Sequence, residues 1–179
     1  MSDNAIQNPA EDSLTAARDE FVNHWGSMGS AWGINRTMAQ IHALLMAGSE
    51  PLSTDQIMDE LQISRGNANT NLRDLVGWGL IKSIFRKGDR KEYFEAEKDV
   101  WKMFCIIARE RNRREISPAK GVLADCAAQT KGLKSKEARE FNKMISEMLD
   151  LIGLGEKVLG RIAASEKSTI AKIAAKMLS

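Results

Sequence analysis

The stretch that decides the fold is residues 51–94, PLSTDQIMDELQISRGNANTNLRDLVGWGLIKSIFRKGDRKEYF. Ser53 opens a short helix, and Gln56 three residues later completes a capping box, in which each side chain binds the backbone of the other residue. A turn of about three residues follows, and Ser64 then caps a second helix that reaches residues 76–77. A helix, a short turn and a second helix form the helix-turn-helix layout.

A β-hairpin is predicted directly after this second helix. Gly79 stops the helix, and residues 80–85 form a strand. Residues 86–91, RKGDRK, make a charged turn that contains glycine, and residues 92–96 form the returning strand. The alternation of apolar and polar residues along the strands is untidy, so this prediction depends more on the turn. A hairpin behind a helix-turn-helix is a wing.

The second helix has a composition that folding alone does not explain. Its start, SRGNANTNLR at residues 64–73, contains three asparagines and Gly66, all of them costly in a helix. A solvated face would more naturally use Glu, Lys and Gln. Asn can bind both N6 and N7 of adenine, and Arg can bind both O6 and N7 of guanine, in the major groove. The outward positions are predicted to be Arg65, Asn67, Asn69, Thr70 and Arg73.

The charge distribution favours the same interpretation. Residues 64–91 carry seven Lys or Arg against two Asp, although the net charge of the whole chain is only +2. Basic side chains at the hairpin tip can follow the minor groove or the sugar–phosphate backbone, whereas the tip alone is equally typical of a solubilising loop. With the polar helix beside it, double-stranded DNA is the partner that the pattern predicts. The basic side chains of the tip are Arg86, Lys87, Arg90 and Lys91.

The chain before this stretch is expected to be a disordered tail, residues 1–12, followed by a helix from Ser13 to about Met28. A glycine-rich break then leads to a helix capped by Asn35 and ending near Ala47. The tail is predicted as a region of its own, and residues 13–97 as a winged helix-turn-helix DNA-binding domain with an N-terminal helix. The break contains Gly26, Gly29 and Gly33.

Residues 98–179 are expected to form a helical dimerisation region, so the fold class is mainly α with a small β-hairpin wing. The expected helices are 98–115, with a boundary at Pro118, one reaching about Thr130, one from Ser135 that Gly153 and Gly155 loosen, and one over 166–178. The helix from Ser135 carries an apolar stripe of Phe141, Ile145, Met148 and Ile152. This stripe either meets a second copy of the chain or folds back on the protomer's own core. A two-fold homodimer would place its recognition helices about one DNA turn apart (~34 Å).

Several classes of function are excluded. The polar, acidic start lacks the pattern of a secretory signal, and no stretch approaches the ~18 apolar residues of a membrane span. Two cysteines favour a reducing compartment, so we expect a cytoplasmic protein without a membrane partner. Nucleophile–base, metal and phosphate-loop motifs are lacking, which predicts no enzyme activity, no cofactor and no metal site.

The same residues carry a resemblance to a known family. Residues 51–94 resemble the winged helix of the GbsR subgroup of MarR-like bacterial transcriptional regulators, chiefly through SRGNANTNLRDLVGWGLI at 64–81 and KGDRKEYF at 87–94. The similarity extends upstream over residues 32–46. It implies a dimer assembled through N- and C-terminal helices, with one recognition helix and one wing per protomer. It also implies DNA contact by Ser64, Arg65, Asn67, Asn69, Asn71, Arg73, Lys87, Arg90 and Lys91.

The wing departs from the pattern of the larger family in one place. Many MarR-like wings place Asp and Arg with one residue between them, whereas Asp89 and Arg90 are adjacent here. The bracing of the wing by an Asp–Arg pair is therefore expected to be absent or different.

A small-molecule effector is a further hypothesis from the resemblance. Some relatives in the subgroup respond to choline-like quaternary ammonium compounds, which aromatic faces bind through cation–π contacts. Trp25, Trp32 and Trp101 are the candidate ligand-binding residues. Because Trp25 and Trp101 lie on apolar helical faces, packing in the core is the better interpretation of each.

We therefore predict a sequence-specific DNA-binding transcriptional regulator, a dimeric repressor on palindromic operators. The alternative is a winged-helix module that binds another protein through the same face. A steep salt dependence of DNA affinity distinguishes the two, because DNA binding by basic side chains releases counterions.

Overall fold

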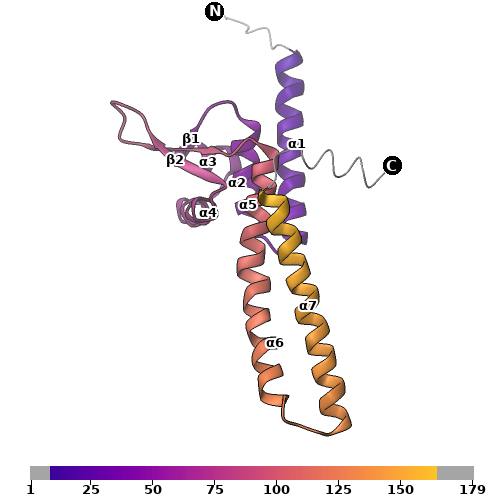
Figure 1. Cartoon of the computed structure of the whole chain (residues 1–179). Helices are drawn as coiled ribbons and strands as arrows, with labels where there is room; N and C mark the ends of the chain where they lie inside the picture. Colours follow the sequence, from indigo (N-terminus) through magenta and orange to yellow (C-terminus); the bar gives the residue numbers. More distant parts are fainter. Residues whose placement is uncertain (1–8, 165–179) are drawn as a thin grey trace, which may run out of the picture. The chain divides into compact units, whose positions relative to one another are not determined.

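The computed structural model describes residues 9–164, and helices dominate that part of the chain (Figure 1). Along the sequence it divides into two compact units, and the division lies between Lys98 and Asp99. The first eight residues of the predicted tail and the predicted helix over 166–178 lie outside the described residues. The first unit contains α1 (Pro9–Ala31), α2 (Arg36–Ala47), β1 (Leu52–Ser53), α3 (Thr54–Leu61), α4 (Arg65–Trp78), β2 (Ile81–Phe85) and β3 (Glu92–Ala96). The second contains α5 (Val100–Arg111), the π-helical turn η1 (Asn112–Ile116), α6 (Ser117–Thr130) and α7 (Lys136–Ala164).

The predicted caps of the first unit are confirmed. The Asn35 side chain accepts a hydrogen bond from the backbone N–H of Met38, 3.1 Å away, and starts α2. At the start of α3, the Gln56 side chain accepts from the Ser53 N–H at 2.9 Å, and the Ser53 hydroxyl accepts from the Gln56 N–H at 3.4 Å. These bonds satisfy N–H groups that the first turn of a helix leaves without a partner.

The turn between α3 and α4 and the end of α4 are set by left-handed backbone. Gln62 adopts φ 51° at the end of α3, and Gly79 adopts φ 79° at the end of α4. Glycine reaches this conformation without steric penalty, so Gly79 ends the helix cleanly and directs the chain into β2. Together these turns confirm the helix-turn-helix.

The core of the first unit is built around α2, which contacts α1, α3, α4 and β3. Large apolar side chains of α2, α3 and α4 fill it, and this packing fixes which face of α4 is left to solvent. The largest fully buried side chains are Ile41, Leu45, Ile57, Leu72 and Leu75.

The first helix is longer than predicted, and its glycines do not break it. A Cβ built at Gly29 would lie 2.6 Å from Cβ of Ala39, and one built at Gly26 would lie 2.6 Å from Cγ of Gln40. Real Cβ atoms do not approach other atoms so closely. The two glycines therefore let α1 and α2 pack against each other, and the predicted break moves past Ala31.

The wing is an antiparallel hairpin, as predicted, and a third strand joins it. β2 pairs with β3, with Ile84 opposite Tyr93, and β1 pairs with the other edge of β3 through Leu52 and Phe94. The sheet order is β1-β3-β2. The short strand β1 was not predicted, because a strand of two residues has no periodicity to detect.

The second unit is more continuous than predicted. The expected boundary at Pro118 is a change of helix type and not a break: the Ser117 N–H bonds to the Asn112 carbonyl, and η1 joins α5 to α6. The wide turn accommodates a proline, which has no N–H to donate. The loosening expected at Gly153 and Gly155 is wrong, because α7 runs through both.

Helices α6 and α7 form an antiparallel hairpin (Figure 1). Near the connection, the Thr130 hydroxyl donates to the Asn142 side chain at 2.6 Å. Further along, Nζ of Lys120 lies 2.5 Å from a carboxylate oxygen of Glu156. These contacts fix the register of the two helices.

Among the described residues, no helix is long and apolar enough to span a membrane.

Candidate nucleic-acid interface

One face of α4 is open to solvent and contains little bulk. Gly66, Thr70, Arg73 and Gly77 are all exposed or half-exposed and follow one another at intervals of three or four residues. Residues at this spacing lie on the same side of a helix. The opposite side of α4 packs against α2 and α3, so this open face is the part of the helix that can enter a DNA groove.

Gly66 is not required by packing inside the described part of the chain. A Cβ at this position would meet no atom within 4 Å, unlike those at the glycines of α1. The neighbouring Asn67 N–H is already bonded to the Ser64 hydroxyl at 3.3 Å, which caps the helix. The N-terminus of α4 thus presents a capped but sterically open turn, the geometry that suits the close approach of a phosphate.

Asn71, for which the resemblance implies a DNA contact, does not face the solvent. Its side chain is only 3% exposed, and its amide donates to the side-chain oxygen of Asn67 at 2.7 Å and to the Asn67 carbonyl at 2.9 Å. The exposed Asn67 amide in turn donates to the Thr37 hydroxyl at 3.4 Å. Asn71 therefore positions Asn67, and a direct contact of Asn71 with DNA stays a prediction.

Asn69 and Arg73 lie on the side of α4 that faces the hairpin. Together with Ser83 of β2 and Glu92 of β3 they line a shallow hollow between helix and wing. Asn69 is half-buried there, whereas Arg73 is exposed and makes no ion pair with the residues that the structure describes. Arg73 is consequently available to bind an external anion.

The wing is braced by Asp89, though without an arginine. The Asp89 carboxylate accepts from the Lys91 N–H at 2.9 Å and from the Tyr93 hydroxyl at 2.7 Å. These two bonds, the Lys91 one foremost, hold the pKa of Asp89 below its usual value. The Arg86 guanidinium lies over the Tyr93 ring, 4.4 Å from its centroid. The sequence predicted that the Asp–Arg brace of the wing is absent or different. The structure has a different brace, in which Asp89 bonds to Lys91 and Tyr93.

The basic side chains of this surface divide into two groups. Arg65 and Lys91 both pair with Asp55, at 2.5 Å and 3.4 Å, and Arg86 pairs with Glu50 at 3.6 Å. In the part of the chain that the structure describes, the others make no ion pair. This unpaired group consists of Arg73, Lys87 and Arg90.

Comparison with known proteins agrees with this geometry. Residues 32–92, which span α2, the helix-turn-helix and the hairpin up to the start of β3, match the model of the MarR family. These residues form a MarR-family domain.

The similarity to individual relatives extends beyond this MarR-family domain. The chain is 25% identical to the HTH-type transcriptional repressor GbsR of Bacillus subtilis (strain 168) over 131 residues, 73% of this chain and 72% of GbsR. It is 26% identical over 155 residues to the HTH-type transcriptional regulator MmpR5 of Mycobacterium tuberculosis (strain ATCC 25618 / H37Rv), covering 85% and 89% of the two chains. The resemblance to the GbsR subgroup is therefore confirmed.

A solved structure shares the fold. It is described as the crystal structure of a transcriptional regulator, with a TM-score of 0.56 and 19% identity, and the match covers 83% of this chain and 99% of the other. The winged helix-turn-helix fold is thereby confirmed.

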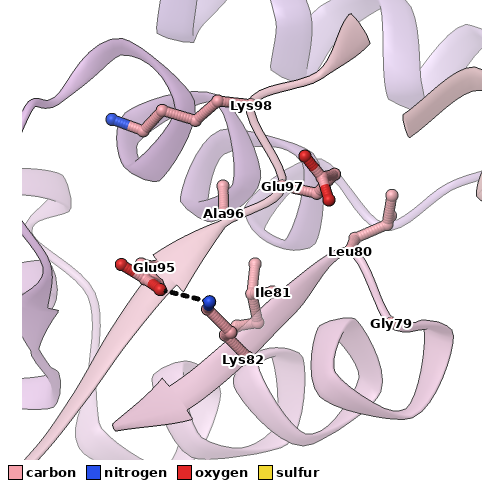
Figure 2. A pocket seen from close by; sticks show the side chains of 8 residues that line it. All are labelled: Gly79, Leu80, Ile81, Lys82, Glu95, Ala96, Glu97 and Lys98. Carbon is pink, nitrogen blue, oxygen red and sulfur yellow. Dashed lines mark ion pairs between the residues drawn. The ribbon is translucent and has the colours of Figure 1, made fainter. Parts of the chain in front are cut away.

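A pocket of about 320 Å³ lies at the root of the wing of the MarR-family domain (Figure 2). Residues 79–82 and 95–98 line it, and Lys82 and Glu95, which are cross-strand partners, form an ion pair of 2.7 Å. Its charged side chains are two lysines and two glutamates, so it favours neither anions nor cations. The ion pair stabilises the hairpin and removes Lys82 from the basic surface.

The tryptophans proposed as ligand contacts lie in different settings. Trp25 packs against Phe21 and His42, with centroid distances of 5.4 Å and 6.4 Å. Trp32 is 56% exposed just after α1, and Trp101 of the second unit stacks on Phe104 at 5.5 Å. The contacts of Trp25 and Trp101 agree with helix packing, and the ligand site stays a prediction.

Two acidic residues of the interface were not predicted from the sequence. Asp55 and Glu50 pair with basic side chains that lie 10 to 36 residues further along the chain. Their contacts arise from the turn and the hairpin, which bring α3, α4 and the wing together. No local pattern in the sequence signals such pairs.

Proposed function

We propose that the protein is a sequence-specific DNA-binding transcriptional regulator, in which α4 enters the major groove and residues 86–91 contact the flanking backbone or minor groove. The observation that carries this proposal is the open face of α4 next to the unpaired cations of the wing. Gly66 allows the backbone to approach a phosphate. Among the described residues, no ion pair has to be broken before a phosphate binds to Arg73, Lys87 or Arg90. The names of the relatives as transcriptional regulators support it.

Within this function, residues at the start of α4 make the direct contacts with bases. Arg65 suits guanine, and Asn67, which Asn71 and Thr37 hold in place, suits adenine. Ser64 has its hydroxyl at the helix cap, where it and the helix end favour a phosphate. A DNA target agrees with the cytoplasmic location that we expect, and by analogy with GbsR we propose a repressor.

A variant of the wing tests the DNA proposal. Lys87→Ala/Arg90→Ala is expected to weaken binding to a selected duplex at least roughly tenfold and to reduce the salt slope by about 0.9 for each phosphate that the wing no longer neutralises. Fluorescence anisotropy at several salt concentrations measures both quantities. Lys136→Ala/Lys143→Ala, which removes the same charge from α7, is the control and should leave both unchanged. If the two variants behaved alike, the wing would not contact DNA.

We also propose that two copies of the chain form a dimer through the second unit. Helix α7 exposes large apolar side chains, and an exposed stripe of this kind is typical of an association surface. A two-fold dimer would present two copies of α4 to a palindromic operator, with half-sites about one DNA turn (~34 Å) apart. The exposed side chains are Phe141, Met144, Met148, Leu151, Leu154 and Val158.

Charges on this stripe are expected to separate the dimer. Leu151→Glu/Leu154→Glu introduces two carboxylates on this stripe. In the single chain Leu151 is 70% exposed and Leu154 is 59% exposed, so the protomer still folds. Sedimentation at micromolar concentration should show a dimer for the unaltered protein and a monomer for the variant. Ser146→Glu, an exposed polar position of α7, is the control and should remain a dimer. A monomeric unaltered protein would refute the proposed interface.

A further inference from the structure

Asp55 connects the two elements proposed to read DNA. It lies in the first turn of α3, and each oxygen of its carboxylate holds a different cation. Nη2 of Arg65, at the start of α4, lies 2.5 Å from Oδ1, and Nζ of Lys91, in the wing, lies 3.4 Å from Oδ2. One anion thus occupies the point at which helix and wing come together.

This carboxylate is charged under ordinary conditions. The hydrogen bond and the charge of Arg65, followed by the hydrogen bond of Lys91, hold its pKa below the usual value. Its side chain is 44% exposed, so neither ion pair is locked inside the protein. Exposed pairs of this kind exchange partners at little cost, and a phosphate can take the place of Asp55.

We propose that Asp55 is a specificity-determining residue: it holds Arg65 and Lys91 away from the phosphates of arbitrary DNA and releases them only when α4 is seated on its operator. This inference rests on the proposed function, because it assumes that α4 and the wing face DNA.

The effect on specificity follows from what each type of complex gains. Non-specific complexes draw essentially all of their affinity from phosphate neutralisation. For them, moving Arg65 from Asp55 to a phosphate replaces one ion pair with another and leaves a bare carboxylate beside a polyanion. The operator complex also gains base contacts, which offset that loss. Asp55 therefore weakens non-specific binding more than specific binding.

The test compares unaltered protein with Asp55→Asn on a selected operator duplex and on a scrambled duplex of the same length. Once a neutral amide replaces the carboxylate, the affinity for scrambled DNA is expected to rise roughly tenfold, and its salt slope to increase by about 0.9 for each of the two released cations. Operator affinity should change by less, so that the ratio of the two affinities falls. The operator salt slope should stay the same.

Two further variants keep the test decisive. Asp59→Asn removes a charge from the same helix at an exposed residue without an ion pair among the described residues, and it should alter neither the ratio nor the slopes. Asp55→Asn combined with Lys91→Ala should lose about half of the added slope, since one released cation is gone. The folded fraction of every variant is checked by its unfolding transition, because an acid in a first turn also stabilises the helix.

The outcomes separate this proposal from the proposed function. Equal gains on both duplexes, weaker binding to both, or the behaviour of Asp59→Asn would each overturn the role of Asp55 while leaving DNA binding intact. Absence of salt-dependent DNA binding by the unaltered protein would overturn the proposed function itself.

Discussion

Gly66→Ala is expected to stabilise the folded protein and to weaken its binding to DNA. A Cβ at Gly66 meets nothing within 4 Å, so alanine fits the fold and raises helix stability by about 0.5–1 kcal/mol. The same methyl group projects from the open face of α4, where it keeps a phosphate away from the helix N-terminus. Loss of a hydrogen bond to a charged phosphate corresponds to roughly ten- to hundredfold weaker binding.

The opposite signs of these two effects make the experiment informative. Unfolding in urea measures the first effect, and titration of the selected duplex measures the second. Gly121→Ala is the matched control, because Gly121 lies inside α6 of the second unit, and a Cβ built there also meets nothing within 4 Å. It should stabilise the fold without a change in DNA affinity. If Gly66→Ala bound DNA as tightly as the unaltered protein, no phosphate would approach Gly66.

Acidification is expected to destabilise the protein through His42. This side chain is 3% exposed, and burial lowers its pKa from 6.5 to about 4. The unfolded chain takes up the proton near pH 6.5, whereas the folded chain takes it up only near pH 4. Stability is therefore complete above pH 6.5 and falls as the pH decreases from 6.5 to 4, by about 3 kcal/mol in total.

His42→Leu should flatten this part of the pH profile. Nε2 of His42 has no hydrogen-bond partner among the described residues, so an apolar side chain of similar size leaves no new polar group unsatisfied. Urea unfolding at intervals between pH 4 and 7 measures the profile. The carboxyls of Asp55, Asp89 and Glu110 have pKa values below their usual 3.8 to 4.5, so their contribution is lost only at the acid end of this window and below it. An unchanged slope in the variant would mean that another group causes the acid sensitivity.

Features set by local interactions were predictable from the sequence. Asn35, Ser53 and Ser64 start helices because a side chain three residues from an N–H can cap it, and Gly79 ends one because its backbone tolerates a positive φ. The outward position of Arg73 likewise follows from helical periodicity.

Features set by contacts between elements were not predictable. Gly26 and Gly29 weaken an isolated helix, but here they allow close packing against α2. The family resemblance predicts Asn71 as a DNA contact, yet the packing of α4 buries it under Asn67. The pairing of Asp55 with cations of α4 and the wing depends on a turn and a hairpin together. In each case the decisive neighbour lies on another element or on the buried side of the helix.

The most direct test of the central claim is selection of duplexes from a random DNA pool by the unaltered protein, followed by titration of the enriched sequence at several salt concentrations. We expect a two-fold symmetric motif with half-sites about one DNA turn (~34 Å) apart, bound with an affinity that falls steeply as salt rises. Enrichment of no motif, with weak binding that is indifferent to salt, would contradict sequence-specific recognition by α4 and the wing. It would point to a protein partner for the same surface.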